Sequence, residues 1–416
     1  MPHIPYGTSE DRTDQGAARE ITKPPISHYL RQGGYQCFYG GKWHLGADNV
    51  HKWFDRYAAC EQDERDYTQW CKLHGIPDGC IFHDPQRDKP YRSVHPPRMS
   101  TPRTGVLDIP DDKEHNFWIL SHAVELLGWR DPDRPLFMVA SMEGPHPPLV
   151  VPQKYYDMYD PADVPVPDNW DPPVGEPSFL ADSYYRRLRN EWGDDFDNWR
   201  KSIAVYWGYA TYIDSLFNRF LERLEDNDLL NENTLLAIVS DHGEMFGQHG
   251  LWQKFCPYEE AMRVPWVMSW PGVIKPGTRC AMDVSHPDLA ATLLAAGGID
   301  PAPLGLEGED LLPYIRGQRP QPESRDCFCQ YNLAPDFRSW HGVENWRTIV
   351  RRPWKYTLHA NGEQEMYNLL DDPGEMKNCA TQATHQAVHR NLHNALLDWC
   401  RRTGDPFMHE PGDPVT

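Results

Sequence analysis

Two apolar segments of strand length constrain the fold of this chain more than any other feature. Residues 136–141 and 234–240 are apolar along almost their whole length, as strands are when both faces of a parallel sheet are covered. Between them, apolar side chains recur at helical spacing from Tyr206 to Leu224. A strand, a helix and a second strand in this order predict α/β layers, with helices packed on a mostly parallel central sheet.

Segments on either side of this unit fit the same architecture. The sequence predicts further strands at residues 35–39 and 264–270, and further helices after Pro24-Pro25, at 114–128 and at 287–296. Residues 50–112 and 145–195 are rich in charges, prolines and aromatics, and they show no such period. We expect ordered loops near the surface in both regions.

The pattern changes after about residue 335. Short strands are expected at 346–350, 354–358 and 365–369, and a last helix at 383–402. Asn361-Gly362, between the last two strands, is a strong hairpin signal. The sequence therefore predicts an α/β domain over residues 1–334 and an α+β subdomain over residues 335–416, the latter a small antiparallel sheet with one helix.

Composition limits the partners of this protein. The formal net charge of −20 excludes a basic surface for nucleic acid. The same field repels anionic ligands, so an anion site must depend on a few local cations or a metal ion. No run of about 18 apolar residues could cross a membrane. The first residues do not resemble a signal peptide, so this sequence indicates a cytoplasmic protein.

The ten cysteines carry little functional signal. They form no CxxC pair, and the one close pair, Cys327 and Cys329, is a weak zinc signal. We expect scattered reduced thiols rather than a metal centre or a disulfide framework.

A lysine and a histidine follow the first predicted strand. Lys42 and His44 lie two residues apart in the segment 40–46, and residues two apart in an extended chain point to the same side. Lysine offers a fixed positive charge to an oxyanion, and histidine offers a donor or a proton. The alternative is a turn with incidental polar residues.

Asp241 and His242 come directly out of the second apolar strand, where open α/β sheets place their ligand sites. Together they offer a hard oxygen and an imidazole nitrogen to a divalent metal ion. Alternatively, Asp241 caps a turn and His242 lies on the surface. Lys254 follows within a short loop, as a second cation or simply a solvated one. His146 lies between prolines after the strand 136–141, which suits a positioned general acid.

Taken together, these segments are similar to the sulfatase family of the alkaline phosphatase superfamily. The resemblance rests on the order and spacing of segments 34–46, 145–147, 240–252, 258–265, 270–272, 354–356 and 365–375. It extends from about residue 20 to about 406. It implies an alkaline-phosphatase-like fold, with a mostly parallel sheet between helices and a small C-terminal antiparallel sheet.

The resemblance implies roles for the matching positions. Lys42 and His44 would contact the substrate oxyanion and the nucleophile. His146 would bind the ester or protonate the leaving oxygen, and Lys254 would hold a sulfate oxygen. Asp241 and His242 would be ligands of one divalent metal ion. Ca²⁺ is expected there, with Mn²⁺ or Zn²⁺ as alternatives because they accept imidazole more readily.

One departure from the family affects catalysis. The family's nucleophile lies in a Cys/Ser-x-Pro-x-Arg motif, where Cys or Ser is oxidised to formylglycine, and an Asp-Asp pair precedes it. Neither precedes Lys42 here. Ser100-Thr101-Pro102-Arg103 has its arginine one position early and lies after Lys42, so we reject it. Met1-Pro2-His3 resembles the stretch that follows the nucleophile helix, and we expect a chain truncated at its N-terminus.

Three functions remain open on the sequence. The first is metal-dependent hydrolysis of a sulfate ester on an anionic small molecule. The second is a phosphodiester or phosphonate monoester hydrolase of the same superfamily, because its members resemble this chain in having His rather than Asn after the metal-binding aspartate. The third is a non-catalytic protein, such as a pseudoenzyme or a scaffold.

Overall fold

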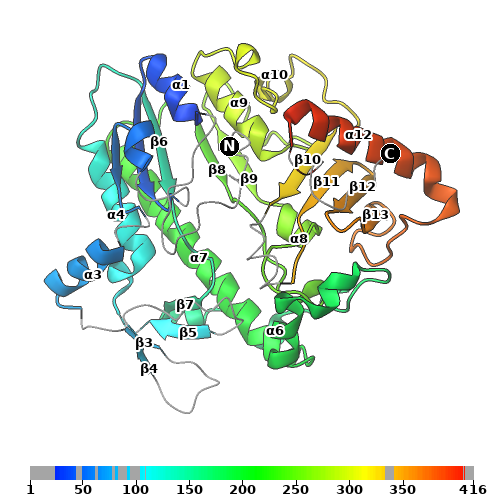
Figure 1. Cartoon of the computed structure of the whole chain (residues 1–416). Coiled ribbons are helices and arrows are strands. Elements are labelled where there is room, and N and C mark those ends of the chain that lie inside the picture. Colours follow the sequence, from blue (N-terminus) through cyan, green and yellow to red (C-terminus); the bar gives the residue numbers. More distant parts are fainter. Residues whose placement is uncertain are drawn as a thin grey trace.

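The computed structural model describes residues 24–43, 49–60, 64–76, 80–82, 91–93, 104–107, 109–332, 342–405 and 407. It has α/β layers beside a small antiparallel sheet, as Figure 1 shows. The predicted fold class is therefore confirmed. None of the helices in these ranges is both long and apolar enough to cross a lipid bilayer.

A three-stranded parallel sheet contains the first predicted strand. β1 (Gln36–Gly41) lies between β2 (Arg56–Ala58) and β6 (Leu136–Ser141). Every residue of β1 is buried, because it has a neighbour on each side. At its end Gly41 has φ +101°, and a Cβ there would lie 1.9 Å from the Ser141 oxygen. Only glycine lets the two strand ends approach this closely.

The strands predicted at residues 234–240 and 264–270 form a separate pair. β8 (Leu236–Val239) runs antiparallel to β9 (Trp266–Ser269), an exception that the prediction of a mostly parallel sheet allows. A parallel return needs a crossover of a dozen or more residues, usually helical. The connection between β8 and β9 contains only a 3-10 turn at Gln248–Gly250 and the short helix α8 (Glu259–Met262), and it carries Asp241, His242 and Lys254.

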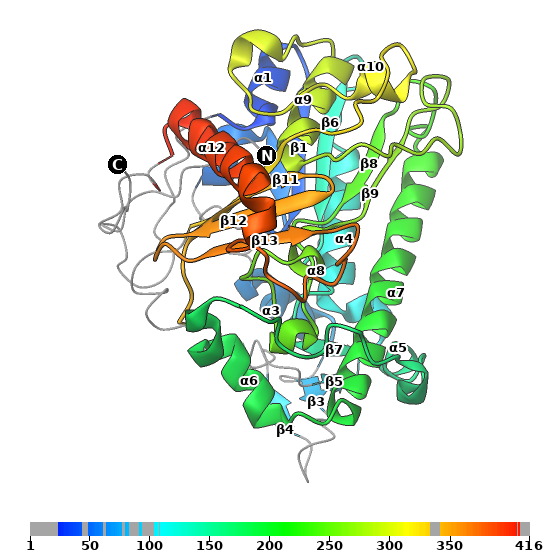
Figure 2. The ribbon, with the colours of Figure 1, turned by 90° about the vertical axis from the view of Figure 1, so that its right-hand side faces the viewer.

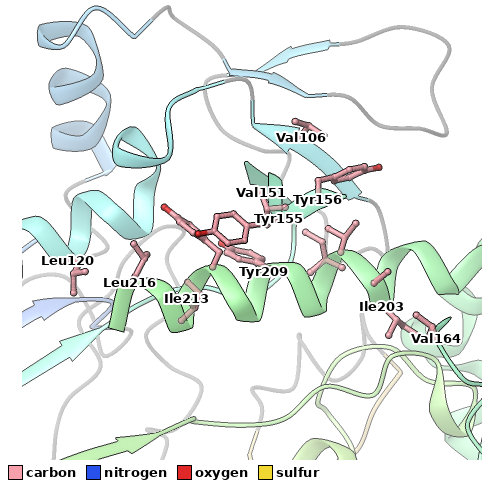
Figure 3. Close-up of a cluster of buried hydrophobic side chains, with 14 of the residues drawn as sticks. Val106, Leu120, Val151, Tyr155, Tyr156, Val164, Ile203, Tyr209, Ile213 and Leu216 are labelled. Carbon is pink, nitrogen blue, oxygen red and sulfur yellow. The ribbon is translucent and has the colours of Figure 1, made fainter. Parts of the chain in front are cut away.

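Helix α7 (Asp197–Asp226) and helix α4 (His115–Leu127) form the largest core. The apolar positions of α7 pack against α4, β5 (Thr104–Leu107) and β7 (Leu149–Pro152), as Figure 3 shows. α4 begins at Glu114, whose buried carboxylate accepts hydrogen bonds from the Asn116 and Phe117 amides. This is helix capping by an acidic side chain, which also suits the helix dipole.

The two regions expected to be loops contain regular structure. β5 and β7 pair in parallel, β2 joins the first sheet, and several short elements lie beside them: α2 (Val50–Trp53), α3 (Glu64–Leu73), β3 (Cys80–Phe82), β4 (Tyr91–Ser93), α5 (Gln153–Tyr156) and α6 (Tyr184–Trp192). The loop expectation was wrong for these residues. Such short segments carry too little period to be recognised alone, and pairing with distant partners decides their structure.

The C-terminal part matches its prediction closely. β10 (Cys327–Tyr331), β11 (Trp346–Arg351), β12 (Trp354–His359) and β13 (Gln364–Asn368) form one antiparallel sheet. Figure 2 shows α12 (Gln386–Thr403) lying across this sheet. β10 lies before the boundary expected at residue 335, which remains a prediction. The remaining α-helices of the described residues are α1 (Ile26–Gln32), α9 (His286–Ala296) and α10 (Leu312–Ile315).

A buried ion pair joins this sheet to the end of the chain. Arg347 on β11 donates to both oxygens of Asp405, at 2.5 and 2.6 Å, and both side chains are fully buried. Removing one partner of such a pair leaves an uncompensated buried charge.

We expect Asp405→Ala to lower the free energy of unfolding by about 3–5 kcal/mol, because Arg347 would lose its counter-charge. Thermal and denaturant unfolding measure the change. Asp398→Ala is the control, since Asp398 pairs with Arg401 at the surface, and its loss should change stability by less than about 1 kcal/mol. Equal effects of the two substitutions would contradict the prediction.

Candidate anion and metal site

The ends of three strands bring the predicted site residues together. Lys42 follows β1, His146 follows β6, and Asp241 and His242 follow β8. Lys254 lies beyond β8, and its Nζ is 2.7 Å from Nε2 of His146. The ring centroids of His146 and His242 are 6.3 Å apart. Five of the six predicted residues therefore share one site, and His44 lies outside the described residues.

Lys42 has an acidic neighbour that the sequence did not reveal. Its Nζ lies 3.9 Å from Oε1 of Glu143, and His115 Nδ1 lies 3.5 Å from Oε2 of the same carboxylate. The hydrogen bond from His115, followed by the charge of Lys42, lowers the pKa of Glu143 to about 2 although burial opposes this. Glu143 is thus ionised throughout the neutral range. Its position two residues after β6 was the available signal.

The turn that carries Glu143 is held by α4. Oδ1 of Asn116 accepts hydrogen bonds from the Glu143 amide at 3.0 Å and the Gly144 amide at 2.8 Å. The Asn116 amide group donates in turn to Glu114 and to Tyr209. This network fixes the turn directly before His146.

His146 is a neutral imidazole with a defined tautomer. Its Nδ1 lies 2.6 Å from the Pro147 oxygen, which can only accept, so Nδ1 carries the proton. Nε2 then accepts from Lys254. Burial, followed by the charges of Lys254 and Lys42, lowers the pKa of His146 to about 4. In this arrangement Nε2 has no proton to give, which favours ester binding over protonation of the leaving oxygen.

Lys254 is the most strongly perturbed cation of the site. Burial lowers the pKa of its ammonium group to about 8, with Lys42 acting in the same direction and the carboxylates of Glu244 and Asp241 opposing them. The charge of Lys42 acts on Lys254, and two such like charges repel each other unless an anion compensates them. The site is thus prepared for a negatively charged ligand, on a protein whose net charge is strongly negative.

Asp241 and His242 fit as two ligands of a metal ion. Nδ1 of His242 donates to the Gly243 oxygen at 2.9 Å, which leaves Nε2 free for coordination. Oδ2 of Asp241 lies 3.6 Å from that Nε2, a spacing that a shared ion at about 2.0–2.4 Å from each atom allows. Burial and the charge of Lys254 lower the pKa of His242, so the imidazole is neutral, as a ligand must be.

The described part of the chain supplies these two donors and no larger set. Within it, no group of three or more His, Cys, Asp and Glu residues converges closely enough to hold a metal ion. The weak zinc signal at Cys327 and Cys329 therefore has no counterpart there. Both lie on β10, and neither forms a disulfide.

Comparison with known proteins identifies the family of this chain. Residues 1–299 match the sulfatase family, and residues 247–402 match the C-terminal region of N-sulphoglucosamine sulphohydrolase. The ulvan-active sulfatase of Formosa agariphila is 27% identical, over 92% of this chain and 66% of its own length. The choline-sulfatase of Rhizobium meliloti is 26% identical, over 88% of this chain and 69% of its own length. The chain thus spans about two thirds of these relatives.

Solved structures share the fold. The phosphonate monoester hydrolase of Silicibacter pomeroyi has a TM-score of 0.74 at 19% identity, covering 94% of this chain and 83% of its own. A protein solved with its substrate D-glucosamine-2-N,6-O-disulfate has a TM-score of 0.72 at 19% identity, covering 96% of this chain and 85% of its own.

We expect Lys254→Met to raise the pKa of His146 from about 4 toward the ordinary value of histidine. Removing a neighbouring positive charge makes the imidazolium form less costly, so the pKa moves upward. An NMR titration of the His146 ring in metal-free protein measures it. Lys275→Met, at an exposed lysine elsewhere, should leave the titration unchanged. A midpoint that does not move in Lys254→Met would contradict the arrangement described here.

Proposed function

Because this chain belongs to the sulfatase family, we propose that it acts in the hydrolysis of a sulfate ester on an anionic small molecule. The observation that carries the proposal is the convergence of Lys42, Lys254 and His146 beside Asp241 and His242. These residues come from separate strand ends, and a structural role does not require two lysines whose charges both act on one buried histidine.

The lysines supply the charge that the ester group needs. A sulfate ester carries one negative charge, and more charge moves onto its oxygens as the bond to the leaving oxygen breaks. Ammonium groups fixed nearby stabilise that charge without reorganising. Lys42 is held by Glu143 and Lys254 by His146, so both are positioned before the ligand arrives.

Asp241 and His242 would hold the metal ion. When bound, a divalent ion would polarise an ester oxygen as a Lewis acid. One carboxylate and one imidazole make Mn²⁺ or Zn²⁺ good candidates beside Ca²⁺, which prefers oxygen ligands. The 416 residues contain no Cys/Ser-x-Pro-x-Arg motif before Lys42. The residues of this site therefore bind the ester and stabilise its developing charge, and none of them is assigned as the nucleophile.

A phosphonate monoester or phosphodiester is the second candidate substrate. One observation favours it: His242 occupies the second metal position, as in the relatives that cleave such esters. Tetrahedral phosphonate and sulfate esters carry the same charge and similar oxygens, so the two lysines would accept either. The non-catalytic alternative predicts anion binding at most.

The first test measures, by calorimetry, the binding of inorganic sulfate to the 416-residue chain. Lys42→Ala and Lys254→Ala should each weaken binding at least about tenfold, because each removes a charge-assisted hydrogen bond. Lys275→Ala is the control at an exposed position. Unchanged binding in both site variants would overturn the proposed anion site.

The second test concerns the metal ion and the substrate class. Chelation should weaken sulfate binding, and Ca²⁺, Mn²⁺ or Zn²⁺ should restore it in the wild-type protein. Asp241→Asn should weaken that restoration at least about tenfold, because it removes a ligand charge. Competition of an aryl sulfate and of an aryl phosphonate with bound sulfate distinguishes the two substrate classes. If the added metal ion restores sulfate binding equally well in Asp241→Asn and in the wild type, the proposed metal site is contradicted.

A further inference from the structure

The loop of residues 244–254 connects the two candidate metal ligands, Asp241 and His242, to Lys254 along the chain. It begins two residues after His242 and ends at Lys254, and it is closed by hydrogen bonds from the Met245 amide to the Gln253 oxygen, 2.9 Å, and from the Gly247 amide to the Leu251 oxygen, 2.7 Å. Three of its non-glycine residues have positive φ: Phe246 (47°), His249 (54°) and Gln253 (69°). Such residues keep this conformation only when surrounding contacts enforce it.

The tip of the 244–254 loop is held by α6. Arg186 donates from Nε to the Gly250 oxygen at 3.0 Å and from Nη2 to the His249 oxygen at 2.8 Å, and Glu176 pairs with the same guanidinium at 2.7 Å. Gly250 has φ +69°, and a Cβ there would lie 2.8 Å from Nε of Arg186, so glycine favours this close approach. The ring of His249 stacks on Tyr258 at 4.1 Å.

The base of the loop is held by Glu244. Oε1 of its carboxylate accepts from the Met245 amide at 3.1 Å and also from the Gln253 amide. The carboxylate thereby links Met245, near the start of the loop, to Gln253, near its end. Gln253 directly precedes Lys254, so a shift of its amide would be passed to the Lys254 backbone. The short contact between Lys254 and His146 would be lost first.

We propose that Glu244 is a positioning residue: its carboxylate closes the 244–254 loop and so holds Lys254 against His146. This assigns to Glu244 a role distinct from the metal ligands two and three residues before it. The inference rests on the proposed function for its consequence, since Lys254 is there taken to bind the ester anion. The loop contacts themselves do not depend on that function.

The test compares Glu244→Gln with Glu244→Met in the full chain. Both substitutions remove the same negative charge and have similar size, but only glutamine keeps an oxygen that can accept the two amide hydrogen bonds. Sulfate should bind at least about tenfold more weakly to Glu244→Met than to Glu244→Gln. Equal sulfate affinity of the two variants would overturn the proposal.

A second comparison shows whether the effect passes through Lys254. In a Lys254→Ala background the difference between Glu244→Gln and Glu244→Met should disappear, because the residue that they position is gone. A difference in sulfate affinity of the same size in both backgrounds would show that Glu244 does not act through Lys254 and would contradict the proposal. If Glu244→Met does not fold, as judged by near-ultraviolet circular dichroism, Glu244→Asp replaces it. Aspartate keeps the charge, but its shorter side chain places the oxygens farther from the two amides. Sulfate should therefore bind about tenfold more weakly to Glu244→Asp than to the wild type.

Amide hydrogen exchange separates this inference from the proposed function. Exchange in residues 245–254 should be faster in Glu244→Met than in Glu244→Gln, since the Gln253 amide has lost its acceptor. Faster exchange together with no sulfate binding in the wild type would reject the function and retain the role of Glu244 in the loop. Equal exchange in the two variants would reject that role, whatever sulfate does.

Discussion

The contact between Lys254 and His146 is the interaction on which the site depends. It joins a loop beyond β8 to the end of β6, two residues 108 positions apart in the chain. An ammonium group this close to an imidazole is stable only if the imidazole is neutral and its second nitrogen is occupied, and the Pro147 oxygen provides for both. Around this contact the chain gathers two lysines and three carboxylates, those of Glu143, Asp241 and Glu244, beyond the ends of β1, β6 and β8.

Charge explains why this site needs so much support. The chain carries a net charge of −20, so attraction for an anion is local and comes from very few groups. Burial lowers the pKa of Lys254, and only nearby carboxylates counteract this. Glu143 beside Lys42 and Glu244 beneath Lys254 are therefore not incidental acids in an anion site. Each keeps a lysine in place, one through an ion pair and the other through the backbone.

The C-terminal sheet reaches the same region through buried charges. Lys355 on β12 lies 2.6 Å from Glu375 and 3.3 Å from Glu259 on α8. The other oxygen of Glu375 accepts from the Glu259 amide at 2.7 Å. Tyr258, which precedes α8 and stacks on His249 of the 244–254 loop, donates to Glu365 on β13. The sheet thus supports the 244–254 loop through Tyr258 and α8.

The sequence by itself determined the long elements and the residue types at their ends. β6, α7 and the β12–β13 hairpin follow from period and turn chemistry, which are properties of neighbouring residues. The same local signals placed Lys42, His146, Asp241 and His242 directly after strands. Only the tertiary structure decided that β9 runs antiparallel to β8, that β5 pairs with β7, and that Glu143 and Glu244 hold the lysines. These features depend on contacts between distant segments and on backbone closure, for which a single sequence carries no periodic signal.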